Sequence, residues 1–113
     1  MSVTSFASGT QTAVIGTEHF VANVNQAGVY ILEVDTVNMV AGDALELRAY
    51  RITLSGGTVR LSEIMTYYGA QEIPHKRCFP ISNDHADAQA LRFSIKQTFG
   101  TGRNFPWKVL KHA

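Results

Sequence analysis

Hydrophobic and polar residues alternate along most of this chain, which is the pattern of β-strands with one buried and one exposed face. Segment 90–99 shows the alternation most clearly. Its apolar positions of one parity are Leu91, Phe93, Ile95 and Phe99, and only Gln97 interrupts them. No segment sustains a helical period, so the pattern predicts an all-β domain with little or no helix.

The same alternation recurs between clusters of Gly, Asn, Asp and Ser. The segments that we expect to be strands are residues 18–24, 29–36, 44–54, 58–68, 79–81 and 105–111. The turn Gln26–Gly28 predicts a hairpin between the first two, and Ser55–Thr58 predicts a second hairpin. The apolar parity changes near Ala49, which predicts a β-bulge or a strand that changes sheets. Seven to eight strands predict a single-domain β-sandwich over residues 1–113, either jelly-roll-like or immunoglobulin-like.

Residues 1–17 carry no charge, and seven of them are Ser or Thr. An uncharged segment with spaced apolar residues is a poor solvated tail. We therefore expect an edge strand or an arm that docks on a neighbouring molecule. Val3 and Phe6 have no evident strand partner within the chain, so we expect them to be exposed unless a neighbour covers them.

Composition narrows the function classes. Of the 113 residues, 45% are hydrophobic and 17% are charged, and the formal net charge is +1. Residues 1–87 hold five basic and nine acidic side chains, whereas residues 88–113 hold five basic and no acidic ones. The basic residues are dispersed and form no dense stripe with stacking aromatics, so we expect no nucleic-acid partner. No apolar run is long enough for a membrane span and no signal peptide is evident, so we expect a soluble protein made in a cytoplasm.

No catalytic or metal-binding motif is evident. The four histidines lie in different segments without metal-ligand spacing, and His85 with Asp87 is the only close pair. The single cysteine excludes an internal disulfide. Cys78 and His75 lie three residues apart beside two prolines, and nothing indicates that they face each other as a nucleophile and its base, so we expect Cys78 to be a small packed residue. We therefore expect no enzymatic activity, no cofactor and no metal.

Aromatic residues are the main candidates for contact with a partner. Adjacent aromatics on a strand point to opposite faces, so one of Tyr67 and Tyr68 is expected outside. The other main cluster is Phe105–Trp107. Outward aromatics also suit a sugar-binding platform, so a carbohydrate-binding module is the main alternative.

Three phrases of the chain carry a resemblance to a known family. They are VDTVNMVAGDALELR at residues 34–48, LRFSIKQTFG at residues 91–100 and the Trp-Lys-Val that begins at Trp107. Together they resemble the capsid cement, or decoration, proteins of short-tailed bacteriophages. The resemblance implies a jelly-roll-like sandwich on the outer surface of the virion, made in the host cytoplasm, that binds the major capsid protein and often itself as a homodimer.

The resemblance also implies a structural role without catalysis, in which the protein stabilises contacts between capsid subunits. Our candidates for capsid contact are Val3, Phe6, Tyr68, Arg103 and Trp107. Two alternatives stay open at this point. One is a carbohydrate-binding module of a virion or tail fibre, and the other is a small interaction protein unrelated to capsids.

Overall fold

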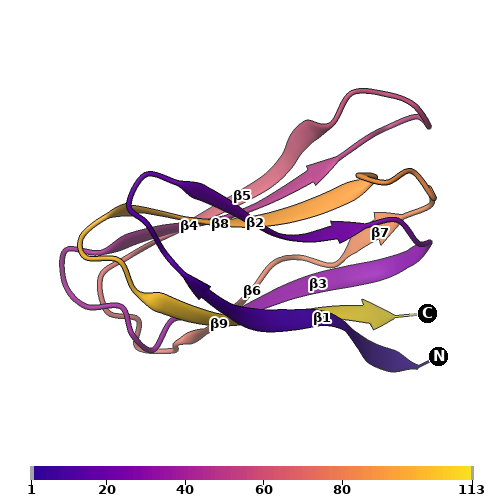
Figure 1. Ribbon diagram of the computed structural model, residues 1–113. Coiled ribbons are helices and arrows are strands. Elements are labelled where there is room, and N and C mark those ends of the chain that lie inside the picture. The colour runs from indigo at the N-terminus through magenta and orange to yellow at the C-terminus, as the bar shows by residue number, and fades with distance from the viewer. Residues whose placement is uncertain (1, 113) are drawn as a thin grey trace.

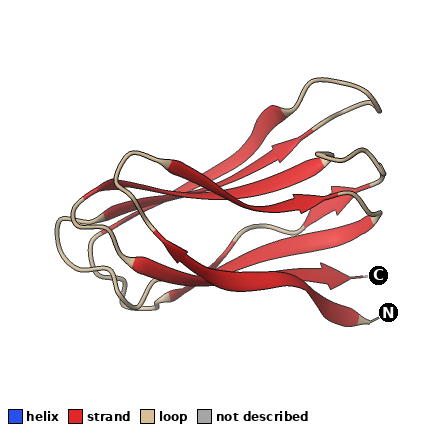
Figure 2. Cartoon of the chain, viewed as in Figure 1, coloured by secondary structure: helices blue, strands red, loops and turns tan. Residues whose placement is uncertain are grey.

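A computed structural model describes residues 2–112, and this part of the chain folds into two antiparallel sheets with no helix (Figures 1 and 2). The first sheet has the order β1-β9-β3-β6, with β7 also paired to β3, and the second has the order β2-β8-β4-β5. The strands are β1 (Val3–Thr12), β2 (Glu18–Val24), β3 (Gly28–Asp35), β4 (Ala44–Arg51), β5 (Arg60–Tyr68), β6 (His75–Arg77), β7 (Ile81–Asn83), β8 (Leu91–Phe99) and β9 (Asn104–His112).

The strand order is that of a jelly roll. Successive strands alternate between the sheets, except for the β4–β5 hairpin within the second sheet and the pair β6 and β7 within the first. β6 and β7 both pair with β3 and form one interrupted edge, so the nine strands within residues 2–112 fill the eight positions of a jelly roll. The expected β-sandwich is confirmed, and the jelly-roll arrangement holds rather than the immunoglobulin-like one.

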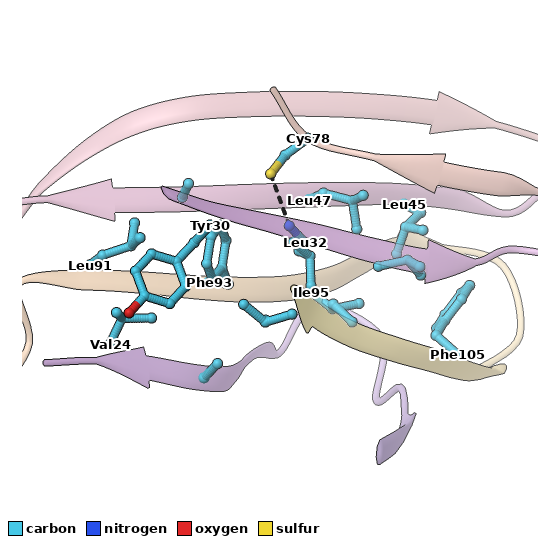
Figure 3. Packing of buried hydrophobic residues seen from close by; sticks show 14 of the residues in the cluster. Val24, Tyr30, Leu32, Leu45, Leu47, Cys78, Leu91, Phe93, Ile95 and Phe105 are labelled. Carbon is cyan, nitrogen blue, oxygen red and sulfur yellow. Dashed lines mark hydrogen bonds between the residues drawn. The ribbon is translucent and has the colours of Figure 1, made fainter. Parts of the chain in front are cut away.

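The core lies between the two sheets and is built from the alternating inner positions of the strands (Figure 3). Its largest fully buried apolar side chains are Tyr30, Phe93, Phe105, Leu32, Leu45, Leu47, Leu91 and Ile95. Tyr30 is the polar exception, and its hydroxyl donates a 2.9 Å hydrogen bond to the Gln26 carbonyl oxygen. This bond offsets the cost of burying the phenol oxygen.

The expected hairpin between residues 18–24 and 29–36 is wrong. β2 pairs with β8, whereas β3 pairs with β9, so the turn before Gly28 carries the chain from one sheet to the other. Both segments bury one parity against the same core, but from opposite sides. The second expected hairpin, between β4 and β5, is confirmed.

A β-bulge lies where the parity of residues 44–54 changes. Ala49 is paired with Glu63 and Tyr50 with Leu61, so the extra residue is Ser62 on β5. The bulge is therefore confirmed at this position, but the extra residue belongs to the partner strand.

A second bulge corrects the interpretation of β8. Leu45 is paired with Gln97 and Ala44 with Phe99, so Thr98 is the extra residue. Gln97 precedes the bulge, keeps the inner parity of Leu91, Phe93 and Ile95 and is fully buried, whereas Phe99 follows the bulge and is 67% exposed instead of lying on the core. The Gln97 amide is satisfied, because Nε2 donates to the carbonyl oxygens of Phe99 and Thr101, and Oε1 accepts from the backbone N–H of Arg103.

The N-terminal segment is an edge strand and does not form a separate arm. β1 pairs with β9 along its length, with a register shift at Phe6. Phe6 is half-buried and packs edge-on against the Tyr30 ring, with 5.4 Å between the ring centroids. The expectation that Phe6 lacks a partner within the chain is therefore wrong, because the bulge turns its side chain toward the core.

One end of the sandwich is held together by a buried carboxylate. Asp43, only 3% exposed, accepts hydrogen bonds from the backbone N–H of Val40 at 3.0 Å and from Arg103 Nε at 2.9 Å. The backbone N–H of Thr101 donates a third, at 3.3 Å. Gly100 has a positive φ of 95°, and a Cβ there would lie 2.0 Å from Asp43 Oδ1, so only glycine fits beside this carboxylate. Asp43 thus joins the β3–β4 loop to the β8–β9 loop.

Candidate functional site

The residues first considered for chemistry are engaged in structural contacts. The Cys78 thiol is 4% exposed, and Sγ accepts a hydrogen bond from the backbone N–H of Leu32 at 3.1 Å (Figure 3). Burial raises the pKa of this thiol to about 11, so it is protonated at neutral pH. His75 instead lies opposite Glu33, with 3.7 Å between Nε2 and Oε1.

Within residues 2–112 no group of three or more His, Cys, Asp or Glu side chains is placed to hold a metal ion. The same part of the chain contains no helix that is long and apolar enough to cross a membrane.

Apolar side chains gather at one end of the outer side of the first sheet. Val3 and Val29 share a row with His112, and Ile31 pairs with Leu110 in the next row. Phe79 and Pro80 border these rows from the β6–β7 connection. We call this set the apolar face, and its members are Val3, Val29, Ile31, Phe79, Pro80 and Leu110.

The apolar face is accessible and shallowly hollowed. Phe79 is 74% exposed and Val3 is 52% exposed, while Val29 and Ile31 are half-buried. One hollow of about 230 Å³ is lined by Val29, Ile31, Pro80 and His112, and a second of about 310 Å³ lies beside Ile31 and Phe79. Neighbouring apolar side chains on the outer side of a sheet are typical of a surface that meets another molecule.

The outer side of the second sheet has a different character. Glu18, Glu46 and Arg48 form a chain of ion pairs there, with 3.7 Å between Arg48 and Glu18 and 2.5 Å between Arg48 and Glu46. Burial alone would raise the pKa of Glu18, but hydrogen bonds from Ser94 and Tyr50 and the charge of Arg48 outweigh it, so the pKa is lowered. These charged and polar side chains bind one another, so few of their hydrogen-bonding groups are left for a partner.

The structure does not bring the five predicted contact residues together. Val3 belongs to the apolar face, and Phe6 packs on the core. Tyr68 is 73% exposed at the end of β5, on the other sheet. Arg103 is bound to Asp43, and Trp107 packs against the core with its indole over Gly9. Tyr68 is thus the outward member of the Tyr67–Tyr68 pair.

Sequence reasoning missed most of the apolar face, although one signal was present. In segment 29–36 the inner parity is Tyr30, Leu32 and Val34, but Val29 and Ile31 are apolar on the opposite parity. Apolar residues on both parities indicate that one side of the strand packs on the core and that the other side contacts another part of the protein or a partner. No comparable signal marks Phe79, because its place depends on how the β6–β7 connection crosses the sheet.

The comparisons with known proteins give one result. Neither a family model, nor a curated protein, nor a solved structure matches this chain. The function is therefore argued from the sequence and from the geometry of the surface.

Proposed function

We propose that this chain is a non-enzymatic structural protein of a bacteriophage virion. In this proposal it binds the outside of the assembled capsid, as a homodimer, and stabilises contacts between major capsid protein subunits. The resemblance to capsid cement proteins is the reason for naming the capsid as the partner. The structural observation that supports the proposal is the apolar face. Jelly rolls serve many functions, so the fold by itself decides none of them.

The apolar face suits a contact that is repeated over a lattice. Val29, Ile31 and Leu110 lie on β3 and β9, the two inner strands of the first sheet, so little backbone entropy is lost at these residues when a partner covers them. The contact on each copy is small, and a small contact gives weak affinity. Several such contacts that engage together on an assembled shell bind far more tightly than one, because the later contacts form at high effective concentration.

Phe79 is the best residue to substitute in a test, because it is exposed, aromatic and outside the core, so its substitution should not disturb folding. Aromatic residues dominate the binding energy of protein interfaces. Phe79→Lys should weaken binding to shells at least about tenfold, which corresponds to about 1.4 kcal/mol. Phe99→Lys is the matched control, because Phe99 is also highly exposed but lies outside the apolar face.

The measurement is co-sedimentation with purified shells that lack this protein. The wild-type chain and Phe99→Lys should sediment with the shells, and Phe79→Lys should stay largely in the supernatant. A wild-type chain that does not sediment refutes the capsid proposal. Equal binding by both variants refutes the apolar face as the contact.

A second candidate function, carbohydrate binding, is favoured by one hollow. About 220 Å³ in volume, it is lined by Trp107, Pro106, His75, Lys108 and the carboxylates of Glu33 and Asp35. Carboxylates, an imidazole and an ammonium group of this kind hydrogen-bond sugar hydroxyls. Trp107 is the only tryptophan, so a saccharide that enters this hollow should change the intrinsic fluorescence. Unchanged fluorescence over a panel of neutral and acidic oligosaccharides would count against this function.

A further inference from the structure

The free edge of β1 differs from the other strand edges of this fold. β1 ends the first sheet, and its strand partner is β9 (Figure 1). It is ten residues long, and nearly all of these residues are exposed or half-buried on the surface. An edge of this kind presents a row of unpaired N–H and C=O groups that another strand can join.

Pro106 determines which backbone groups of β1 point outward. Thr10 lies opposite Pro106, which has no N–H and cannot complete a hydrogen-bonded pair. The backbone groups of Thr10 therefore point away from β9, toward the free edge. The pairs alternate in type along an antiparallel ladder, so the same holds for Ser8 and Thr12. The Thr12 carbonyl already accepts a bond from the Gln11 side chain at 3.0 Å, whereas Ser8 and Thr10 carry no such side-chain cap.

Charge distinguishes β1 from the other edges. Natural edge strands are commonly protected by charged side chains, which discourage pairing with another strand. β2 carries Glu18, β5 carries Arg60 and Glu63, and β6 carries Lys76 and Arg77. β7, which continues the β6 edge, is uncharged but only three residues long, whereas β1 has ten residues. β1 carries no charged residue along its whole length. The bulge at Phe6 interrupts the strand near its start, but the segment from Ala7 to Thr12 keeps a regular register.

We infer that the free edge of β1 pairs with the β1 edge of a second copy, antiparallel and about a two-fold axis near Thr10. Such a pairing places each residue opposite one from the same strand, so a charged strand would oppose like charges. β1 avoids this because its outward positions are Ser8, Thr10 and Thr12. Their hydroxyl side chains meet across the axis, and cross-strand Ser and Thr pairs are favourable. The symmetry closes after one step, so the product is a dimer and not a filament.

This arrangement has a consequence for the apolar face. Two antiparallel strands related by a two-fold axis lie in one continuous sheet, with equivalent faces on the same side. The apolar faces of both copies therefore point in one direction. This deepens the proposed homodimer and, insofar as the proposed function holds, lets one dimer contact two capsid subunits. The pairing itself is tested without any capsid.

The first test is the molar mass in solution, measured by light scattering after size exclusion over a range of concentrations. The wild-type chain should be a dimer. Thr10→Lys places two ammonium groups across the axis and should give a monomer with an unchanged circular dichroism spectrum, whose unfolding midpoint no longer depends on protein concentration. The matched control is Thr66→Lys, an exposed threonine on the β5 edge, which should remain a dimer.

A covalent test checks the axis directly. Hydrogen-bonded antiparallel pairs have Cα atoms about 5.5 Å apart, which lies within the range that a disulfide spans. Thr10→Cys should form a disulfide-linked dimer under mild oxidation, and Thr66→Cys should not. The native Cys78 does not interfere, because it is buried.

Either of two results would overturn the inference. One is a wild-type chain that stays monomeric at all concentrations, and the other is a Thr10→Lys variant that remains dimeric. Shell binding separates this inference from the proposed function. A monomeric wild-type chain that still sediments with shells refutes the homodimer and its β1 pairing but not the binding to the capsid, whereas a dimer that does not sediment refutes only the capsid role.

Discussion

Replacing Asp43 by Asn should destabilise the protein in a pH-dependent way. The carboxylate accepts three hydrogen bonds, and one of them comes from the Arg103 guanidinium. Each hydrogen bond to a charged group contributes about 1.5–3 kcal/mol, but Asn retains one acceptor oxygen and Arg103 is partly exposed. We therefore expect a loss of about 3 kcal/mol near pH 7, or about 12 °C in the unfolding midpoint.

The pH dependence follows from the pKa of Asp43. Burial alone would raise this pKa, but the hydrogen bonds from Val40, Arg103 and Thr101 outweigh it and lower the pKa below its ordinary value of 3.8. A lowered pKa means that the ionised carboxylate stabilises the folded state. This stabilisation is complete above about pH 4 and is lost as the pH falls through the folded-state pKa. The difference between wild type and Asp43→Asn should therefore shrink below about pH 4.

Urea unfolding, followed by the fluorescence of Trp107, measures both effects. The control is Asp84→Asn, because the Asp84 side chain is 77% exposed and its ion pair with Arg51 is solvent-screened. This control should change the free energy of unfolding by less than about 1 kcal/mol. A loss for Asp43→Asn that is equal at pH 7 and at about pH 3 would show that ionisation of the carboxylate is not the cause.

Two further predictions concern buried groups. Phe6→Ala should lower the free energy of unfolding by about 2–3 kcal/mol in a urea titration, because it removes the ring that packs on Tyr30. The control Val3→Ala should change it by less than about 0.5 kcal/mol, as for exposed sites. Equal effects of the two substitutions would mean that β1 does not pack as described. Cys78 should resist a thiol reagent near pH 8 in the folded protein and react promptly in urea, because burial keeps its thiol protonated and covered; rapid labelling of the folded chain would contradict this burial.

The fold class could be predicted because alternation reports directly on which residues face the core. Strand pairing was harder to predict. The short turn before Gly28 looks the same whether it joins neighbours in one sheet or crosses between two. Bulges were hardest to assign, because an extra residue belongs to a pair of strands. The parity change on β4 drew attention to Ala49, but the extra residue there is Ser62 on β5, and β4 itself keeps a regular register with β8 at that point.

The candidate surface shows a similar limit. Val29 and Ile31 could be recognised as apolar residues on the outer parity of a strand. Leu110 lies beside Ile31 only because β9 pairs with β3. This pairing joins residues that are far apart in the sequence. A single sequence gives no direct information on such long-range pairing.

The positions of β8 and β9 have a consequence for how the protein folds. β8 lies between β2 and β4, and β9 lies between β1 and β3, so residues 91–112 form the centre of both sheets. Until these residues leave the ribosome, β1 and β2 have no strand to join. Pairing β1 with β9 and β2 with β8 closes long loops of the chain, which costs conformational entropy. A high proportion of such long-range contacts slows folding. We expect the growing chain to expose unpaired strand edges, including the uncharged β1, until residues 91–112 have emerged, which makes folding dependent on rapid synthesis of this segment or on chaperones.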